Sequence, residues 1–110
     1  MVILNKNEQI RERNTKVYAG RIKDKESLLK SSSGGAFTAL SDYFLDNGDM
    51  VVAATYNYQT YTEEFTFLHN KAERDAACGS KYMQSNPGAI FRKAELWLKE
   101  NPEKRLMFVG

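Results

Sequence analysis

Apolar residues recur at helical spacing in a segment near the middle of the chain. These positions are Ala36, Phe37, Leu40, Tyr43 and Phe44. They are separated by one, three or four residues, which places them on one face of a helix. Asn47 and Gly48 follow them, and both residue types suit a helix C-terminus. The pattern predicts a helix over residues 36–47.

A second apolar stripe predicts another helix near the C-terminus. It consists of Ile90, Ala94, Trp97 and Leu98. The sequence Ser85-Asn86-Pro87 precedes it and places a capping residue before a proline, which is favoured at the first helical position. We therefore expect this helix to begin near residue 87 and to run to about residue 100.

Four shorter segments have the composition of strands. Residues 15–22 are β-branched and aromatic, whereas residues 49–56 and 106–110 are continuously apolar, as in strands buried on both faces. Residues 64–70 alternate in character and follow a polar, tyrosine-rich loop at 57–62, which predicts a hairpin with the strand at 49–56. Residues 72–77 can form one helical turn.

The order strand, helix, strand over residues 15–56 permits a right-handed crossover and a parallel strand pair. The predicted fold class is therefore α/β, a small mixed sheet of about four strands with two main helices. Residues 1–14 turn polar after Leu4 and have no hydrophobic period, so we expect a lead-in arm followed by a single domain over residues 15–110. The last predicted strand ends with the chain, where a functional loop begins in open α/β sheets, so we expect a fragment of a longer protein.

Composition and charge narrow the possible functions. Apolar residues make up 42% and charged residues 27% of the 110 residues, as in ordinary globular domains. The net charge of +2 is too small for general attraction to nucleic acid or acidic membranes. A nucleic-acid module using Lys81, Arg92 and Lys93 is disfavoured because the basic residues are dispersed. Any anion site must be local.

The sequence also limits the cellular compartment and the metal sites that the protein can have. No apolar run approaches the roughly 18 to 20 residues of a membrane span, and no signal peptide is recognisable. The single cysteine, Cys78, excludes an internal disulfide and cannot by itself supply the ligands of a zinc site or an iron–sulfur cluster. We therefore expect a cytoplasmic protein without a metal site of its own.

The sequence Ser31-Ser32-Ser33-Gly34-Gly35 lies directly before the first predicted helix. Ser33 is a candidate N-cap, and the glycines let backbone N–H groups approach an anion closely, where the helix dipole adds about half a positive charge. The alternative is that Ser33 only caps the helix and the glycines only form a turn. The segment matches neither a P-loop nor the dinucleotide-binding fingerprint.

A second small loop, Gly79-Ser80-Lys81-Tyr82, offers a flexible glycine, a hydroxyl, a cation and an aromatic ring. Lys81 could bind an anion and Tyr82 could pack against a ring. An exposed lysine beside a half-buried tyrosine is the alternative, and it is the more frequent situation.

No catalytic residue can be assigned from the remaining chemistry. Cys78 is expected to pack as a small hydrophobe, because His69 is the only histidine and no Cys–His pair can be argued. His69 is expected to be a packed or rim residue. Tyr56, Tyr58 and Tyr61 could stack on a planar ligand, but a hairpin loop does not need a ligand to explain its tyrosines.

Taken together, several motifs resemble the N-terminal domain of the coenzyme F-420 hydrogenase/dehydrogenase beta-subunit family. They are KSSSGGAFTAL at residues 30–40, the strand at 49–54, GSKYMQS at 79–85 and the closing MFVG. The resemblance extends over roughly residues 17–110. The S-x-S-G-G and G-S-K-Y signatures occur in the family in this order and at about this separation.

The resemblance implies redox chemistry with FAD. Family members are flavoproteins that carry electrons between FAD and iron–sulfur clusters, with ferredoxin or a deazaflavin coenzyme as partner in some. By this likeness, one group of residues would line the flavin or its phosphates: Ser31, Ser33, Gly34 and Gly35. A second group would form the facing part of the pocket: Gly79, Ser80, Lys81 and Tyr82. Lys81 near the N1 and O2 edge would favour the anionic reduced flavin.

The chain departs from the family pattern in two ways. The cluster cysteines have no counterpart here, and neither does the T-P-C-Q motif that follows the equivalent of MFVG. We therefore expect the missing N- and C-terminal domains of its own subunit to be partners, and the isolated chain to be inactive. The alternative function is a non-catalytic interaction or structural domain that pairs through its terminal strand.

Overall fold

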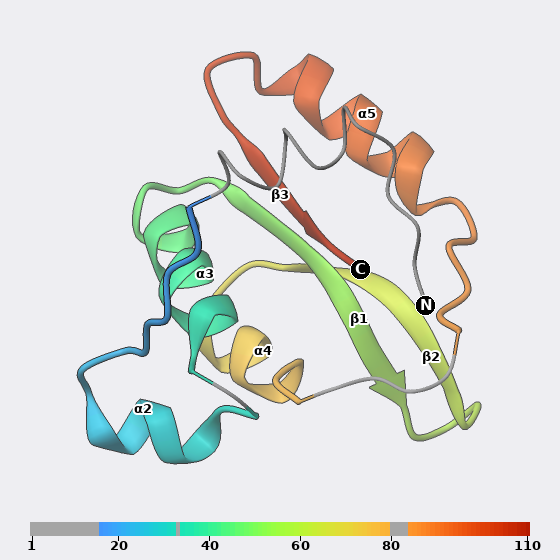
Figure 1. Cartoon of the computed structure of the whole chain (residues 1–110). Helices are drawn as coiled ribbons and strands as arrows, with labels where there is room; N and C mark the ends of the chain where they lie inside the picture. The colour runs from blue at the N-terminus through green and yellow to red at the C-terminus, as the bar shows by residue number, and fades with distance from the viewer. Residues whose placement is uncertain (1–15, 33, 80–83) are drawn as a thin grey trace, which may run out of the picture.

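The protein is described by a computed structural model that covers residues 16–32, 34–79 and 84–110. Its centre is a sheet with the strand order β2-β1-β3 (Figure 1). β1 (Met50–Asn57) pairs antiparallel with β2 (Thr62–Leu68) and parallel with β3 (Leu106–Val109). The α/β class is confirmed, with three strands in the described part of the chain where we expected about four.

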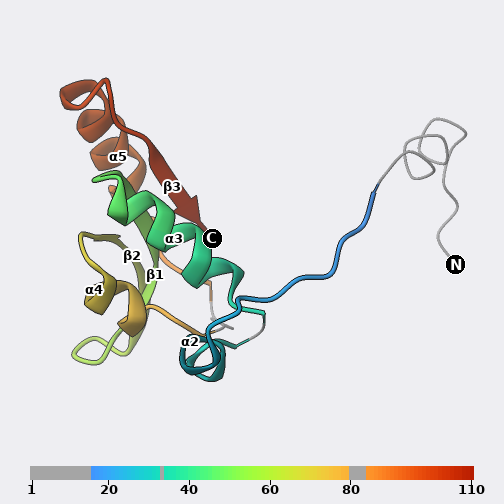
Figure 2. The ribbon, with the colours of Figure 1, turned by 90° about the vertical axis from the view of Figure 1, so that its left-hand side faces the viewer.

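Helices lie on both faces of the sheet. α3 (Ala36–Asp46) and α4 (Lys71–Ala76) lie on one side, and α5 (Ile90–Glu100) lies on the other (Figures 1 and 2). A short helix, α2 (Lys25–Lys30), precedes α3. The two long helices, the hairpin and the helical turn near residues 72–77 are confirmed.

The predicted strand at residues 15–22 is wrong for its described part. Residues 16–22 are extended but pair with no strand among the described residues, and Val17 and Tyr18 are 89% and 83% exposed. Strand-forming side chains stabilise a strand only where a sheet edge and an apolar face accept them. The parallel pair of the fold is therefore β1 with β3. The charged residues that follow begin α2, where the Asp24 carboxylate accepts a hydrogen bond of 2.8 Å from the Ser27 N–H.

The start of α5 also differs from the expectation. The Asn86 N–H donates to the Glu63 carbonyl at 3.0 Å, and the Asn86 side chain accepts from the Gly88 N–H at 2.9 Å. These bonds hold the backbone beside β2 and in a turn, so α5 begins at Ile90 with Ala89 as its N-cap. Pro87 lies in that turn and not at the first helical position.

The two faces of the sheet bury different side chains. Val51, Ala53 and Leu68 form a buried cluster with Ala77, covered by α3. On the opposite face, the ring of Phe108 packs between Phe65 and Phe91, with centroid separations of 4.9 and 5.2 Å. The first four residues of β1 are buried, which confirms the expectation for this apolar strand.

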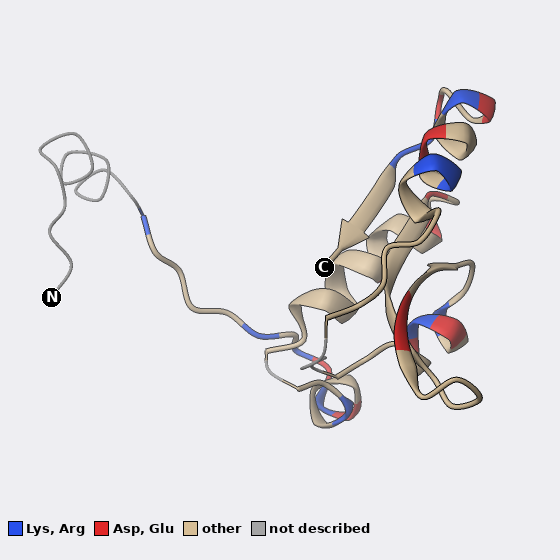
Figure 3. Ribbon diagram, turned by 90° about the vertical axis from the view of Figure 1, so that its right-hand side faces the viewer, with Lys and Arg blue, Asp and Glu red and all other residues tan. Residues whose placement is uncertain are grey.

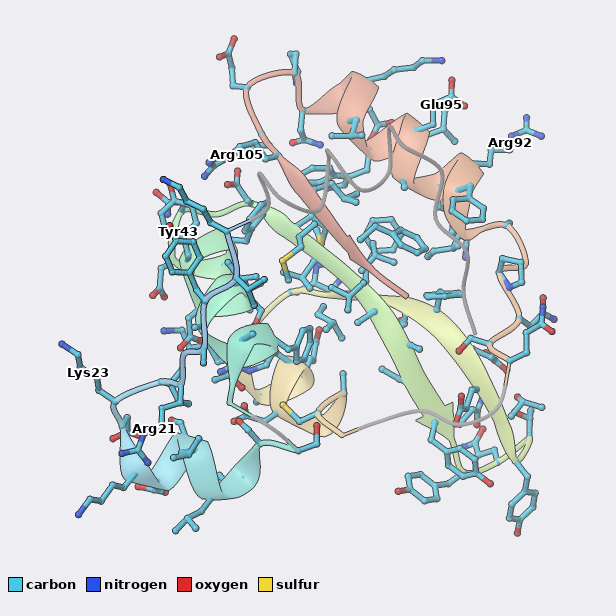
Figure 4. The ribbon with its side chains drawn as sticks, viewed as in Figure 1. Arg21, Lys23, Tyr43, Arg92, Glu95 and Arg105 are labelled. Atoms are coloured by element: carbon cyan, nitrogen blue, oxygen red, sulfur yellow. The ribbon has the colours of Figure 1, made fainter. Side chains whose placement is uncertain are left out.

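An ion pair joins the amino ends of β1 and β3. The Asp49 carboxylate accepts hydrogen bonds from the Arg105 backbone N–H at 3.0 Å and from its guanidinium Nε at 2.8 Å. The guanidinium lies over the rings of Tyr43 and Phe44, 5.1 and 5.2 Å from their centroids (Figure 4). The backbone N–H of Arg105 is the largest cause that lowers the pKa of Asp49, and the guanidinium lowers it further.

This depressed pKa predicts an acid-dependent loss of stability. The folded pKa lies below the value of about 3.9 in the unfolded chain, so the stabilisation is fully present above the unfolded pKa. It is lost as the pH falls through the folded pKa. The free energy of unfolding from urea titrations at pH 2 to 7 should therefore fall more steeply below pH 4 for the wild type than for Asp49→Asn. Parallel pH profiles would contradict the assignment.

Candidate functional site

A cavity of about 420 Å³ lies at the carboxyl end of β3, between the N-terminus of α3 and the C-terminus of α4. Its apolar lining comes from the sheet and from both helices. These residues are Ala36, Phe37, Ala53, Ala54, Phe65, Ala77 and Val109. Its other lining residues are Ser31, Ser32, Gly35, Thr38, Cys78, Gly79, Gln84, Ser85 and Gly110. The volume falls within the range of small-molecule and cofactor sites.

The cavity lies beside β1 at the carboxyl end of β3. β3 pairs with β1 only as far as Ala53, opposite Val109. From Ala54 onward, β2 is the only strand beside β1 in the described part of the chain. Ala53 and Ala54 carry small side chains, which leave space where β3 ends. This location agrees with the rule that ligands bind beyond the carboxyl ends of parallel strands.

The N-terminus of α3 faces this cavity without a side-chain cap. Gly35 is the N-cap, with a φ of 81°, and no side chain forms a capping hydrogen bond at this end of the helix. A Cβ at Gly35 would lie 2.6 Å from Ile22 Cδ1, so both the conformation and the space require glycine. Ala36, Phe37 and Thr38 of the first turn line the cavity. Their backbone N–H groups can therefore bind an anion there.

The sequence led us to expect Ser33 as the N-cap of this helix, but the N-cap is Gly35. Two glycines precede Ala36, and the second adopts the left-handed conformation that directs the chain into the helix. A serine at this position would be strained, and its side chain would collide with Ile22.

Polar groups line the side of the cavity near α2. Ser31 Oγ donates to the Ser27 carbonyl at 2.8 Å and lies 3.3 Å from Thr38 Oγ1. Thr38 Oγ1 lies 4.0 Å from Cys78 Sγ. The two hydroxyls and the thiol therefore form a short polar strip in an otherwise apolar wall.

Three of the predicted site residues meet at the cavity: Ser31, Gly35 and Gly79. Gly79 has a φ of 103°, and a Cβ there would meet nothing within 4 Å. Gly34 does not line the cavity, because it packs against the preceding segment: its carbonyl accepts from the Ile22 N–H at 2.8 Å. Ser33, Ser80, Lys81 and Tyr82 lie outside the described residues. The binding roles of all eight remain predictions.

Several lining residues were not anticipated from the sequence. Thr38 is a buried residue in the first turn of α3. The apolar periodicity of the sequence indicated only that this turn packs on the core, and gave no sign that Thr38 lines a cavity. Ala53 and Ala54 follow two valines in the strand, and their small side chains were the feature of the sequence that could have indicated a cavity nearby. The contribution of Phe65 depends on the hairpin register, which places it opposite Ala54.

Other residues considered from the sequence lie outside the cavity lining. His69 is exposed directly after β2, where its backbone N–H donates to the Glu73 carboxylate at 2.8 Å and its ring stacks on Phe67. The hairpin tyrosines are likewise absent from the lining. Within residues 16–32, 34–79 and 84–110, no three His, Cys, Asp or Glu side chains group as metal ligands do.

A buried arginine supports the α3 wall from behind. The Arg74 side chain is 5% exposed, and its Nη1 donates to the Thr38 carbonyl and to Ser41 Oγ, both at 2.8 Å. The same side chain forms ion pairs of 2.8 Å with Asp42 and Asp75. Arg74 therefore fixes the first turns of α3 against α4, and with them the position of Thr38.

Comparisons with known proteins agree with the resemblance seen in the sequence. The profile of the family described as coenzyme F420 hydrogenase/dehydrogenase, beta subunit N-terminal, matches residues 17–90. A solved chain from the xenon-derivatized F420-reducing NiFe hydrogenase complex of Methanosarcina barkeri is similar, with 30% identity and a TM-score of 0.54. The match covers 73% of this chain but 26% of that one, so the chain spans about a quarter of its length. A comparison with curated proteins found no match.

No helix of the described segments has the length and apolarity that a membrane crossing requires.

Proposed function

Because the chain belongs to the coenzyme F420 hydrogenase/dehydrogenase beta-subunit family, represented by its N-terminal part, we propose that its cavity binds FAD within an oxidoreductase subunit. The observation that carries this proposal is the uncapped N-terminus of α3, which faces a largely apolar cavity. A flavin nucleotide combines a planar ring system with phosphates. The cavity offers an apolar wall for the first and backbone N–H groups for the second.

The residues of the cavity divide into three roles under this proposal. The first-turn N–H groups of α3 would bind phosphate oxygens, and Ala54, Phe65 and Val109 would contact the apolar part of the ring system. Ser31 Oγ, which donates to the Ser27 carbonyl, would accept a hydrogen bond from the ligand, and the Thr38 hydroxyl would donate or accept one. A bound flavin supplies the capacity to accept and release electrons. The protein supplies binding, orientation and partial exclusion of water.

Iron–sulfur chemistry does not fit the residues of this chain. A cluster requires about four cysteine thiolates, and the sequence contains one cysteine. We therefore propose that electrons leave or reach the flavin through other parts of the subunit or through a partner such as ferredoxin or a deazaflavin coenzyme. We also propose a cytoplasmic location, in which a free thiol such as Cys78 stays reduced.

A flavin titration tests this proposal. Binding to the 110-residue chain is measured by the change in flavin fluorescence and visible absorbance, with FAD, FMN and riboflavin compared. FAD and FMN should bind about tenfold more tightly than riboflavin, because the α3 N-terminus stabilises a phosphate that riboflavin lacks. Equal affinities for FAD, FMN and riboflavin would contradict a phosphate site at the α3 N-terminus. If none of the three flavins bound, the proposal that the cavity binds FAD would be contradicted.

A second candidate function is pairing through the terminal strand. β3 forms an edge of the described sheet, and its residue Phe108 is 36% exposed while the stacking partner Phe91 is 61% exposed. Open strand edges with apolar neighbours favour the addition of another strand. Sedimentation at several protein concentrations tests for self-association. A monomer at all concentrations would leave no support for pairing between copies.

A further inference from the structure

The tip of the β1–β2 hairpin places two tyrosine rings beside a buried carboxylate. The rings of Tyr56 and Tyr58 have centroids 4.9 Å apart and planes at 76° to each other. The antiparallel register sets Tyr56 directly opposite Glu63, so their side chains lie on the same face of the sheet. Two walls at nearly a right angle with an acidic neighbour form the kind of corner that recognises cations.

Among the described residues, Glu63 and Asp42 are the two carboxylates with a buried oxygen that has no hydrogen-bond partner, and Asp42 forms an ion pair with Arg74 at 2.8 Å. Glu63 is 7% exposed, and its Oε2 is buried without a hydrogen-bond partner in the described part of the chain. The adjacent Glu64 differs, because its carboxylate accepts from the hydroxyls of Thr60 and Thr62 at 3.3 and 2.9 Å. Burying a carboxylate without a partner is costly. A nearby cation would therefore stabilise the Glu63 carboxylate, and no group of the hairpin supplies one.

The charge around the hairpin favours such a partner. Residues 51–70 contain two glutamates and no lysine or arginine. Figure 3 shows acidic colour on β2, whereas the basic residues lie on the helices, on the segment before α2 and at the start of β3. No lysine or arginine of the hairpin itself can therefore neutralise Glu63.

The tip is also held in one conformation. The Asn57 side chain accepts from the backbone N–H groups of Gln59 and Thr60 at 2.9 and 3.3 Å. Tyr61 has a φ of 57°, which is uncommon for an aromatic residue and often occurs at functional sites. Tyr58 and Tyr61 are 78% and 72% exposed. A rigid loop that displays tyrosines loses little conformational entropy on binding.

We propose that Tyr56, Tyr58 and Glu63 bind a lysine or arginine side chain of another protein chain. The exposed tyrosine faces contact the cation, and the negative charge of the largely buried Glu63, on the same face of the sheet as Tyr56, attracts it without a direct contact. The site is on the tip of a hairpin and outside the cavity, which suits a protein surface as its occupant more than a small molecule. Tyr61 extends the uncharged contact area around the cation. This inference does not depend on flavin binding.

Peptide titrations followed by NMR test the site. The probes are the capped peptides acetyl-Gly-Lys-Gly-amide and acetyl-Gly-Arg-Gly-amide, with the norleucine peptide as the uncharged control. Both cationic peptides should shift the resonances of Tyr56, Tyr58 and Glu63 and bind about tenfold more tightly than the control. Equal shifts with norleucine would overturn the proposal, as would the absence of shifts at these residues.

Two variants separate recognition from folding. Glu63→Gln removes the charge and keeps the shape, and should weaken binding of the lysine peptide about tenfold while thermal stability is maintained or increased. Tyr58→Leu should weaken it several-fold. Tyr18→Leu is the matched control, because Tyr18 is also exposed but lies outside the hairpin. Unchanged binding by Glu63→Gln would contradict the proposal, whereas a loss of stability would assign the carboxylate a structural role.

Discussion

Replacing Arg74 with methionine is expected to lower the free energy of unfolding by about 2 to 3 kcal/mol. The guanidinium is buried and satisfies the Thr38 carbonyl and the Ser41 hydroxyl, which is fully buried. Methionine fills much of the same volume but donates no hydrogen bond. The expected loss is smaller than for a fully buried ion pair, because the Asp42 and Asp75 side chains are 37% and 59% exposed, although the paired oxygen Asp42 Oδ1 is itself buried.

Urea denaturation of the Arg74→Met variant measures this effect. Lys71→Met is the matched control, because it removes a neighbouring cation of α4 whose side chain is 49% exposed and pairs with Asp46. That variant should change stability by less than about 0.5 kcal/mol. Similar losses for both variants would show that general charge, and not the buried hydrogen bonds, holds α4 against α3.

Replacing Ala54 with leucine is expected to weaken FAD binding about tenfold or more. Ala54 lines the cavity beyond the end of β3, where β1 has no strand neighbour on that side among the described residues. A larger side chain there occupies space that the ligand would use, and overpacking a well-fitted site typically costs about 1 to 3 kcal/mol. The change is conservative in polarity, so the effect reports volume.

The same FAD titration on the variant checks this expectation. Ala72→Leu makes the identical substitution on an exposed position of α4 outside the cavity, and should leave affinity unchanged. Circular dichroism establishes that both variants fold. Equal affinity for the Ala54→Leu variant and the wild type would place the flavin elsewhere.

The elements that the sequence predicted well are those with a strong local pattern. β1 is continuously apolar and buried in its first half, so its pattern and its burial agree. Periodicity also identified α3, although the residues that α3 buries are Thr38 and Ser41, and Leu40 and Tyr43 of its apolar stripe are each 55% exposed. The hairpin followed from the alternation in β2 and from the polar residues between the strands. For these strands, local pattern and tertiary environment favour the same structure.

The failures occurred where long-range contacts override the local pattern. Residues 16–22 have strand-forming side chains but pair with neither edge strand of the described sheet, and Pro87 is kept out of α5 by the bond between Asn86 and the Glu63 carbonyl. Such partners are remote in sequence and leave no local signal.

The candidate site could be predicted only in part for the same reason. The glycine pair indicated the α3 N-terminus, but the two glycines turned out to differ. Gly35 faces the cavity and starts the helix, whereas Gly34 packs against Gly20. The cavity lies beside Ala53 and Ala54 at the end of the β1–β3 pairing, and this pairing cannot be predicted from either segment separately.

Mapping the flavin on the protein tests the central claim most directly. Backbone amide resonances of the isotopically labelled 110-residue chain are recorded during a titration with FAD. The account predicts that the largest shifts occur at the first turn of α3, at Ala53 and Ala54, and at Val109. The hairpin tip and the exposed face of α5 should change little. The largest shifts at the hairpin tip or along α5, with none at the α3 N-terminus, would contradict it.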